Sequence, residues 1–474
     1  MKNITVACLL LFSLFQNIVI SQTLSVSFDV KNYVNDTVII GNYYGDKNLV
    51  KDTLVAKSKG KFVWNQDTIP APGVYLALLK PDNTYVQFLI GDKGEKFSME
   101  FDANDLLDVK VKGSPENMAF YKYLSFLKDK RTVADTMKAR LDRAKASNTT
   151  DKVSQGVLDQ LDKEVKKHQS DIVEQYPGSI IWLLIRSNID IELPEFTGPE
   201  DTIRYKRYYY YKDHYFDNID PKHPALIRTP FIHQKIDYYI TKLVNQQPDS
   251  LIKSLDLVLH WLEPNGEAYR FYLADFLNRY AQMKMVGQDA LYVHLVDNYY
   301  SKGKATWVSK ENLDKMKENS DELRPILIGK IMPDITTYKE DGSPVRLSDI
   351  KSPHTVVIFW APDCGHCQKV MPDVVKFFNN NKDKGLKMLG ICTKGGDKTA
   401  TCWPAVKEKG MEGFINTADE YSRYNMKVRI KSTPKIFILD EKKEIVVKDI
   451  PGEELDRIFN EILSFEEKKK TENR

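Results

Sequence analysis

Cysteine is scarce in this sequence: its 474 residues include five, and one of them, Cys8, lies close to the N-terminus. The other four are too few to build a fold from disulfide bonds, so hydrophobic cores must hold the chain together. The formal net charge of +3 is small for this length and gives no reason to expect a nucleic-acid partner. A chain of this length is expected to form roughly two to four domains.

Residues 1–21 have the pattern of a cleaved secretory signal peptide. Lys2 gives a positive start, residues 7–15 form a short apolar run, and Val19-Ile20-Ser21 precede the expected cleavage point. The run is too short for a membrane-spanning helix, which needs about 20 apolar residues, and no later segment reaches that length. An uncleaved amphipathic anchor is the alternative. Because Cys8 would leave with the signal, we expect an exported chain with four cysteines, in a compartment where disulfides persist.

Residues 22–115 carry the period of β-strands. Apolar residues alternate along 24–30, and two further extended stretches, 85–90 and 96–101, flank the turn sequence Gly91-Asp92-Lys93-Gly94 and predict a hairpin. Roughly seven or eight short strands separated by turns favour a β-sandwich, with a small barrel as the alternative. The stretch contains no cluster of chemically active side chains.

Residues 116–325 predict a helical region. Val157, Leu161, Val165 and Ile172 form a helical apolar stripe with charged residues between them. Further helices are expected around 179–185, 231–244, 251–261, 268–280 and 288–300, followed by a polar connector over 302–324. No repeat of fixed period is present.

The stretch RYKRYYYYKDHYF, residues 204–216, interleaves basic and aromatic side chains. Such a pattern can bind single-stranded nucleic acid by stacking and charge neutralisation. A tyrosine-rich helix that packs one face while its hydroxyl groups reach water has the same composition. An exported chain with little net charge favours the packed helix, and we expect no nucleic-acid partner.

Residues 326–474 predict a third domain of mixed α/β type. Strands are expected at 355–361, 386–393, 435–440 and 445–450, with helical stretches between the first three. The order strand, helix, strand, helix and closing hairpin implies a mixed sheet covered on both faces.

Two cysteines, Cys364 and Cys367, follow the first strand of this domain and open a helix that runs to about residue 380. Cys367 belongs to the apolar stripe of that helix and therefore points toward the core. Cys364 lies at the helix N-terminus, where free backbone amides and the helix dipole stabilise a thiolate. These positions predict that Cys364 attacks a substrate disulfide and that Cys367 resolves the mixed disulfide.

His366 lies between the two cysteines. An imidazolium there would favour the Cys364 thiolate, stabilise the dithiol and make the disulfide more oxidising. A surface histidine without an electrostatic role is the alternative.

Two other interpretations of the cysteine pair are weaker. A zinc site would require a second close pair or two histidines at finger-like spacing, which the sequence lacks, and a purely structural disulfide is an uncommon use of a helix tip. We expect no metal.

The segment Phe359-Trp360-Ala361, then Cys364-Gly365-His366-Cys367 and Pro372, resembles the active-site segment of thioredoxins. Thr433-Pro434 matches the loop in which that family has a cis-proline facing the cysteines. The resemblance implies that Trp360, Thr433 and Pro434 contact the substrate, whose extended chain pairs with the backbone of this loop.

The sequences of residues 329–334 and 345–350 resemble the extracytoplasmic TlpA/ResA-type branch of this family. The likeness covers about residues 328–463 and implies a thioredoxin fold. The part before it resembles, more loosely, envelope proteins of Gram-negative bacteria in which β-rich and helical domains precede such a domain. This implies a location in the periplasm or cell envelope.

The sequence departs from the thioredoxin pattern at two positions. Asp363 stands where thioredoxins usually have a tryptophan, and its carboxylate would oppose the thiolate and partly counter His366. Ile358 occupies the position of the buried acid that assists proton transfer to the second cysteine. The dipeptide Gly365-His366 is that of protein disulfide isomerases, which adds oxidation and isomerisation to the expected roles.

Cys392 ends the second strand of the domain, at the sheet edge where α/β proteins place their sites, and Cys402 follows ten residues later. The intervening Gly395-Gly396 would let the chain fold back and join them in a second disulfide. Two independent free thiols are the alternative.

These residues predict an extracytoplasmic thiol–disulfide oxidoreductase, either a reductase or an isomerase, that needs no cofactor. Its partners would be proteins with cysteines or disulfides and a redox partner, for which a membrane-bound electron carrier is one candidate. A thiol peroxidase is a second hypothesis, although related peroxidases have Thr three residues before the cysteine and position 361 is Ala. A third hypothesis is a binding or assembly protein in which the redox domain is auxiliary.

Overall fold

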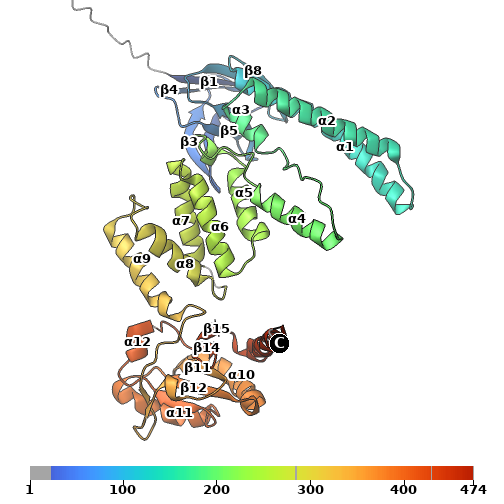
Figure 1. Cartoon of the computed structure of the whole chain (residues 1–474). Helices are drawn as coiled ribbons and strands as arrows, with labels where there is room; N and C mark the ends of the chain where they lie inside the picture. The colour runs from blue at the N-terminus through green and yellow to red at the C-terminus, as the bar shows by residue number, and fades with distance from the viewer. Residues whose placement is uncertain (1–22, 283–284, 429, 473–474) are drawn as a thin grey trace, which may run out of the picture. The chain divides into compact units, whose positions relative to one another are not determined.

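The computed structural model describes residues 23–282, 285–428 and 430–472 (Figure 1). The expected signal peptide, residues 1–21, lies outside the described residues. In the part of the chain that is described, no helix is long and apolar enough to cross a membrane.

The chain divides into two compact units. The first contains the residues up to 243 together with 260–269, and the second contains 244–259 and the residues from 270 onward. The helical region predicted over 116–325 therefore contributes to both units.

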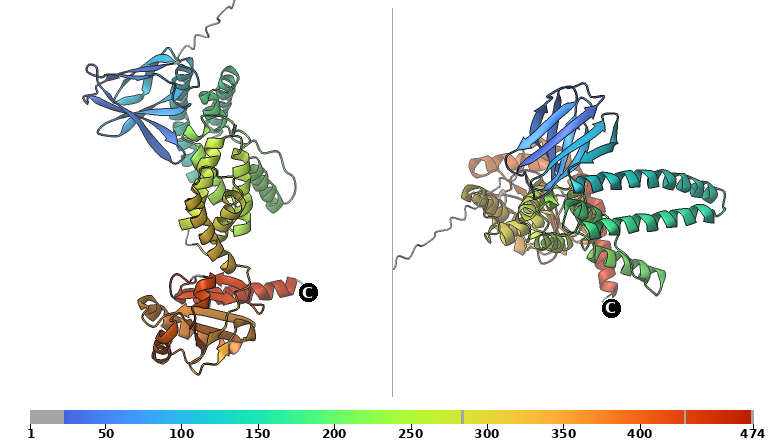
Figure 2. Two further views of the ribbon diagram at one scale, coloured as in Figure 1. Left: turned by 90° about the vertical axis from the view of Figure 1, so that its left-hand side faces the viewer. Right: turned by 90° about the horizontal axis from the view of Figure 1, so that it is seen from above.

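The N-terminal part of the first unit consists of two four-stranded sheets (Figure 2). One has the strand order β4-β1-β7-β8 and the other β3-β2-β5-β6. The strands are β1 Leu24–Lys31, β2 Thr37–Tyr44, β3 Lys47–Val55, β4 Lys61–Gln66, β5 Gly73–Leu79, β6 Thr84–Ile90, β7 Lys96–Asp102 and β8 Asp105–Lys112. The ring of Phe88 on β6 contacts Phe28 and Trp64 of the other sheet at centroid distances of 5.5 and 6.1 Å, so the two sheets share an aromatic core.

The strands predicted at 85–90 and 96–101 are confirmed as β6 and β7, but the predicted hairpin between them is wrong. β6 pairs antiparallel with β5, whereas β7 pairs parallel with β1 in the other sheet. The turn at residues 91–94 therefore carries the chain from one sheet to the other. Local turn chemistry suits both connections, and only the long-range pairing with β1 decides between them.

Helix α1, Pro115–Ala146, covers the edge of β6 that does not pair with β5. The buried side chain of Asn117 accepts a hydrogen bond from the Leu89 backbone N–H at 2.7 Å and donates one to the Leu89 carbonyl at 2.8 Å. One turn later, Tyr121 Oη donates to the Gln87 carbonyl at 2.6 Å. These backbone groups of Gln87 and Leu89 lie on the edge of β6 that does not pair with β5, so α1 satisfies groups that would otherwise be open to another chain.

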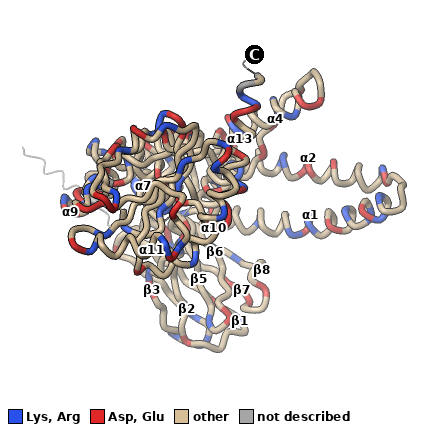
Figure 3. Tube along the Cα trace, turned by 90° about the horizontal axis from the view of Figure 1, so that it is seen from below, with Lys and Arg blue, Asp and Glu red and all other residues tan. Residues whose placement is uncertain are grey.

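Helix α2, Lys152–Gln175, returns beside α1, and the two helices form a long antiparallel hairpin (Figure 2). Gln169 donates to the hydroxyl of Tyr123 across the pair at 3.0 Å. Lys and Arg residues are interspersed with Asp and Glu along both helices (Figure 3).

The remaining helices of the middle region are α3 Ile180–Arg186, α4 Glu200–Asp213, α5 Ile232–Tyr238, α6 Pro248–Leu262, α7 Gly266–Gln282, α8 Asp289–Leu295 and α9 Lys310–Leu323. The predicted helical stretches are confirmed as α2, α3 and α5 to α8. The predicted connector over 302–324 is wrong for most of its length, because α9 occupies 310–323 and buries Ser320 and Glu322.

The packing predicted for the tyrosine-rich segment, residues 204–216, is confirmed only at its C-terminal end, where Tyr215 and Phe216 are buried. Over the rest of the segment, helix α4 forms but buries none of its residues, and Tyr205 is 62% exposed. Its tyrosines contact one another instead: the rings of Tyr205 and Tyr209 lie 4.3 Å apart between centroids. Tyr208 Oη donates to the Leu243 carbonyl at 2.6 Å, which holds the helix through a hydroxyl group rather than an apolar face.

The C-terminal domain lies in the second unit and contains a seven-stranded sheet of order β10-β9-β13-β12-β11-β14-β15 (Figure 1). Its strands are β9 Thr337–Tyr338, β10 Pro344–Val345, β11 His354–Trp360, β12 Leu386–Cys392, β13 Ile415–Ala418, β14 Lys435–Leu439 and β15 Ile445–Lys448. β11, β12 and β13 run parallel, and β14 and β15 form the predicted closing hairpin. Its helices are α10 Gly365–Asn381, α11 Cys402–Glu408, α12 Arg423–Val428 and α13 Leu455–Glu472.

Both faces of this sheet are buried, as expected for a mixed sheet. On one face Ile358 and Val356 pack with the apolar stripe of α10 and with α13. On the other, Val357 and Phe359 pack with Tyr424 and the segment that leads into the sheet. Alternate residues of β11 thus serve two cores, which explains why this strand is apolar throughout. Packing on both faces of the sheet therefore fixes the position of the end of β11 and of the start of α10, which follows β11 in the chain.

We predict that Asn117→Leu lowers the free energy of unfolding of the first unit by about 2–4 kcal/mol, because two backbone groups of Leu89 lose their partner. Urea denaturation followed by circular dichroism measures this loss. Met118→Leu, at a neighbouring position that is 50% exposed, is the control and should change stability by less than about 0.5 kcal/mol. Equal stabilities for the two variants would contradict the role given to Asn117.

Candidate active site

The cysteine pair lies where the spacing predicted. Cys364 is the N-cap residue of α10, and Cys367 is in the first turn of that helix. The backbone N–H of Cys367 donates to Cys364 Sγ at 3.1 Å, and Cys364 Sγ donates to the Thr433 carbonyl at 3.2 Å. Both cysteines are free thiols. Cys364 is partly exposed and Cys367 is fully buried.

The environment of Cys364 favours its thiolate. Partial burial raises its pKa, but hydrogen bonds from the Cys367 side chain, from Thr433 and from the backbone N–H groups of Cys367 and His366 outweigh burial. The net effect is a pKa below the ordinary value of a cysteine. A helix N-terminus supplies such amide donors because its first N–H groups have no partner within the helix.

Cys367 has the opposite environment. Burial in the core under β11 and the neighbouring Cys364 raise its pKa to about 11. At neutral pH it is therefore a protonated thiol while Cys364 carries the reactive thiolate fraction. The two cysteines are chemically distinct, as their positions on the helix predicted.

The loop opposite Cys364 contains Thr433-Pro434, and its peptide bond is cis, as the resemblance to thioredoxins implied. The Thr433 carbonyl points at Cys364 Sγ. Trp360 is placed differently from the expectation. It is 1% exposed and packs in the core that contains Cys367, so its indole does not reach the surface on which a substrate would lie.

The two residues expected to tune the site differ in their surroundings. The Asp363 carboxylate is held by Lys394, whose Nζ lies 2.7 Å from Asp363 Oδ2. The hydrogen bond from Lys394 is the main cause that lowers the pKa of Asp363. His366 is exposed, and its backbone N–H contributes to the low pKa of Cys364.

The position of the missing acid, Ile358, is buried in β11 and packs in the core beside Cys367. Among the described residues, no group of three or more His, Cys, Asp and Glu side chains is arranged to hold a metal ion.

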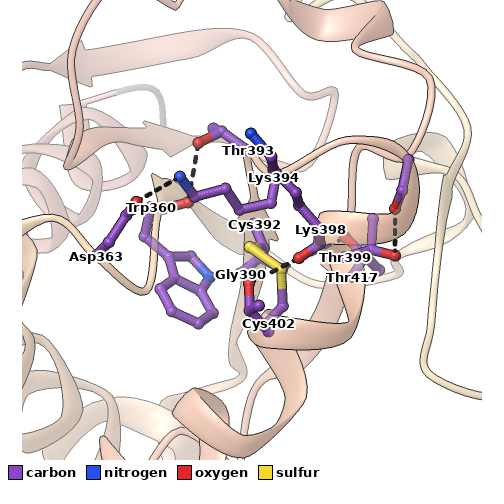
Figure 4. Close-up of a disulfide and its surroundings, with 12 residues drawn as sticks. Trp360, Asp363, Gly390, Cys392, Thr393, Lys394, Lys398, Thr399, Cys402 and Thr417 are labelled. Carbon is purple, nitrogen blue, oxygen red and sulfur yellow. Dashed lines mark hydrogen bonds and ion pairs between the residues drawn. A yellow bond between two sulfur atoms is a disulfide. The ribbon is translucent and has the colours of Figure 1, made fainter.

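Cys392 and Cys402 are joined in a disulfide, which is the first of the two alternatives that the sequence left open (Figure 4). Cys392 ends β12, and Cys402 begins α11. Both are fully buried. The disulfide closes the loop that contains Lys394 and the 3-10 turn Gly396–Thr401.

Sequence reasoning did not identify Lys394. A signal for it exists, because Lys394 follows Cys392 by two residues at the carboxyl end of β12, and β12 runs parallel to β11. Residues that follow neighbouring parallel strands meet at one edge of the sheet. The strand order is needed to know that β11 and β12 are neighbours.

Comparison with protein-family models assigns two parts of the chain. Residues 327–462 match the Redoxin family, which confirms the predicted resemblance of the C-terminal domain. Residues 163–324 match a domain of unknown function, DUF5106.

Among solved structures, a domain of a possible thiol-disulfide isomerase from Cytophaga hutchinsonii is 26% identical and covers 31% of this chain and 97% of its own, with a TM-score of 0.28. A thioredoxin-like protein from Bacteroides caccae is 15% identical and covers 57% of this chain and 96% of its own, with a TM-score of 0.43. Because both scores are below 0.5, the assignment of the domain rests on the family model.

A curated protein, peptide deformylase 1 of Burkholderia multivorans, is 30% identical over 118 residues, which is 23% of this chain. The chain spans 62% of the length of that relative.

We predict that iodoacetamide alkylates Cys364 rapidly at pH 8 and leaves Cys367 unmodified. The thiolate fraction of each cysteine rises as pH passes its pKa, which is lowered for Cys364 and raised to about 11 for Cys367. Mass-spectrometric mapping of the reduced native protein across pH 6 to 10 measures both rates. Faster labelling of Cys367 than of Cys364 in the native protein would overturn the assignment of their roles.

We predict that the variant Cys364→Ser/Cys367→Ser, expressed from residue 22 onward, has no titratable thiol when it is denatured without reductant, because Cys392 and Cys402 are bonded. Ellman's reagent in urea counts the thiols. Replacing both cysteines by alanine should lower the free energy of unfolding of the domain by about 2–4 kcal/mol. Two thiols per chain in the first experiment would show that the disulfide is absent.

Proposed function

Starting from the redoxin domain of residues 327–462, we propose that this protein is an extracytoplasmic thiol–disulfide oxidoreductase that exchanges disulfides with protein substrates. The observation that carries the proposal is the asymmetry of the pair. Cys364 is partly exposed, its sulfur accepts a hydrogen bond from the backbone N–H of Cys367, and its pKa is lowered. Cys367 is buried, and its pKa is raised. An attacking thiolate and a sheltered resolving thiol need these environments.

In the reducing direction, the Cys364 thiolate attacks one sulfur of a substrate disulfide. A bond forms between Cys364 Sγ and that sulfur, the substrate S–S bond breaks, and the second substrate sulfur leaves as a thiolate. Cys367 then loses its proton to solvent or to that thiolate and attacks Cys364 Sγ. A bond forms between the two cysteine sulfurs, the bond between Cys364 Sγ and the first substrate sulfur breaks, and that sulfur leaves as a thiolate. The substrate leaves with both sulfurs reduced, and the two electrons lost by the cysteines equal the two it gains.

The raised pKa of Cys367 makes its deprotonation the demanding part of the second step. Thioredoxins assist it with a buried acid, and Ile358 supplies no such group here. The proton must then be taken up by water, by the substrate thiolate or by another group of the protein. Slow deprotonation of Cys367 would slow the release of the substrate from the mixed disulfide. The mixed disulfide would then last long enough for isomerisation, in which another thiol of the substrate displaces Cys364 from it.

The loop of Thr433-Pro434 is the proposed binding place of the substrate chain. Its carbonyl lies within hydrogen-bond distance of Cys364 Sγ, so an extended segment that pairs with this backbone would bring its cysteine against the nucleophile. In the free enzyme the thiol donates to this carbonyl, and a bound substrate amide would replace that donor.

An extracytoplasmic location is consistent with two features. The N-terminal 21 residues have the pattern of a signal peptide, and a buried structural disulfide persists in oxidising compartments. We place the protein in the periplasm or cell envelope, with a second redox protein, of which a membrane-bound carrier is one candidate, to restore the dithiol. We interpret the N-terminal sheets, residues 22–115, as a β-sandwich, which together with the helical region to 325 serves binding or assembly.

We predict that the wild-type protein catalyses the reduction of insulin by dithiothreitol and that Cys364→Ser abolishes the catalysed rate. Cys367→Ser should retain the attack and accumulate a mixed disulfide with insulin, because the resolving thiol is missing. Non-reducing electrophoresis detects this species, and turbidity measures the rate. Lys376→Ala, at an exposed position of α10, is the matched control.

Equal insulin reduction by wild type and Cys364→Ser would remove the proposal. Rapid consumption of hydrogen peroxide with a thiol donor, in the absence of insulin reduction, would favour the peroxidase. That enzyme is not favoured by the site, because Ala361, at 7% exposure, supplies no hydroxyl to orient a peroxide.

A further inference from the structure

The four-residue segment between β11 and α10, residues 361–364, is held by a loop from the neighbouring strand. Thr393 donates twice to the Trp360 carbonyl, from its backbone N–H at 2.9 Å and from Oγ1 at 3.2 Å. The next residue, Lys394, donates from Nζ to Asp363 Oδ2 at 2.7 Å (Figure 4). Two of these hydrogen bonds therefore hold the last residue of β11, where the segment begins, and the third holds Asp363, directly before the nucleophile.

The loop that supplies these bonds is itself fixed. Cys392 pairs with Trp360 across the sheet, and its disulfide to Cys402 ties the far end of the loop to α11. Midway, the Gly396 N–H donates to the Glu420 carbonyl at 2.9 Å. Lys394 thus projects from a closed loop of limited freedom, and its side chain is only 26% exposed. An ordinary surface lysine has no such constraint.

The position of the ion pair matters because of the residue it adjoins. Asp363 precedes Cys364 directly, and its side chain is 71% exposed. A carboxylate on the residue next to a thiolate is expected to repel it and to disfavour the charged nucleophile. The ammonium of Lys394 offsets this charge locally.

The other charged groups around Cys364 do not replace Lys394. Lys431 and Lys435, which flank the loop of Thr433-Pro434, are paired with Glu322 and Asp449. Lys398, in the same closed loop, acts on Asp363 through its charge and ranks below Lys394 among the causes that lower the pKa of Asp363. His366, on α10, is a further titratable residue near Cys364 in the sequence and is exposed.

We propose that Lys394 is a positioning residue that holds and neutralises Asp363 beside the nucleophile, and that the Cys392–Cys402 disulfide keeps Lys394 in place. The proposal rests on the proposed thiol–disulfide exchange at Cys364. It gives the second disulfide a role in the reactivity of the first pair as well as in stability. Neutralising Asp363 favours the thiolate and so stabilises the reduced state of the pair.

The test is the pH profile of the rate at which iodoacetamide alkylates Cys364, in full-length variants that carry Cys367→Ser. We expect Lys394→Met to raise the apparent pKa of Cys364 by roughly half a unit, which corresponds to about a threefold slower reaction below that pKa. Lys394→Arg should restore the profile, because it keeps the charge and the donor. Lys387→Met, at an exposed position at the other end of β12, is the control and should leave the profile unchanged.

Two further variants examine the partners of Lys394. Asp363→Asn should shift the profile to lower pH, and its combination with Lys394→Met should return the profile close to that of the parent. The paired variant Cys392→Ala/Cys402→Ala should shift the profile in the same direction as Lys394→Met, and adding Lys394→Met to it should produce little further change. An unchanged profile in the paired variant would remove the role given to the disulfide, and the single lysine variants test the role of Lys394 independently of whether the paired variant folds.

An unchanged profile in Lys394→Met, or a shift that Lys394→Arg does not reverse, would overturn the proposal. These measurements need no protein substrate. Failure of the wild type to reduce insulin, with the shift in Lys394→Met intact, would remove the proposed function and leave the ion pair's effect on the thiol standing.

Discussion

The hydrogen bond from the Cys367 N–H to Cys364 Sγ is the interaction on which the site depends. It exists because Cys364 caps α10, where the first amides of the helix have no acceptor of their own. The same geometry turns Cys367 into the core, where burial raises its pKa. One helix terminus therefore produces two thiols with opposite properties, and the exchange reaction requires that difference.

The seven-stranded sheet fixes the position of this helix terminus. β11 is buried on both faces and leads, through residues 361–364, into α10, so the segment that carries the nucleophile is anchored in two cores. The sheet also brings residues that are distant in the sequence to the edge where Cys364 lies. Thr433, in the loop before β14, contacts Cys364, and Lys394, which follows the adjacent strand β12, contacts Asp363. The carboxyl ends of the parallel strands β11 and β12 and the start of the antiparallel strand β14 lie at this same edge.

Other interactions hold together the residues before the redoxin domain. Two sheets share an aromatic core around Phe88, and α1 covers the edge of β6 with hydrogen bonds from Asn117 and Tyr121. In the second unit, the buried Lys448 of β15 donates to Asp289 of α8 and, at 2.7 Å, to the Ile326 carbonyl. The helices of that unit are thus attached to the redoxin domain through a buried charge, which requires such partners.

The sequence by itself determined the local elements whose period or terminus is written in neighbouring residues. These are the helix that begins at Cys364, the distinction between the two cysteines, the strands β11, β12, β14 and β15, and the helices with an apolar stripe. It did not determine β13, whose four residues are too short to show a period, nor the pairing of β7 with β1. The exposure of α4, the burial of Trp360, the bond between Cys392 and Cys402 and the contact of Lys394 with Asp363 were decided only by the tertiary structure. Each depends on which strands and helices become neighbours, and that choice is made by the burial of whole faces rather than by adjacent residues.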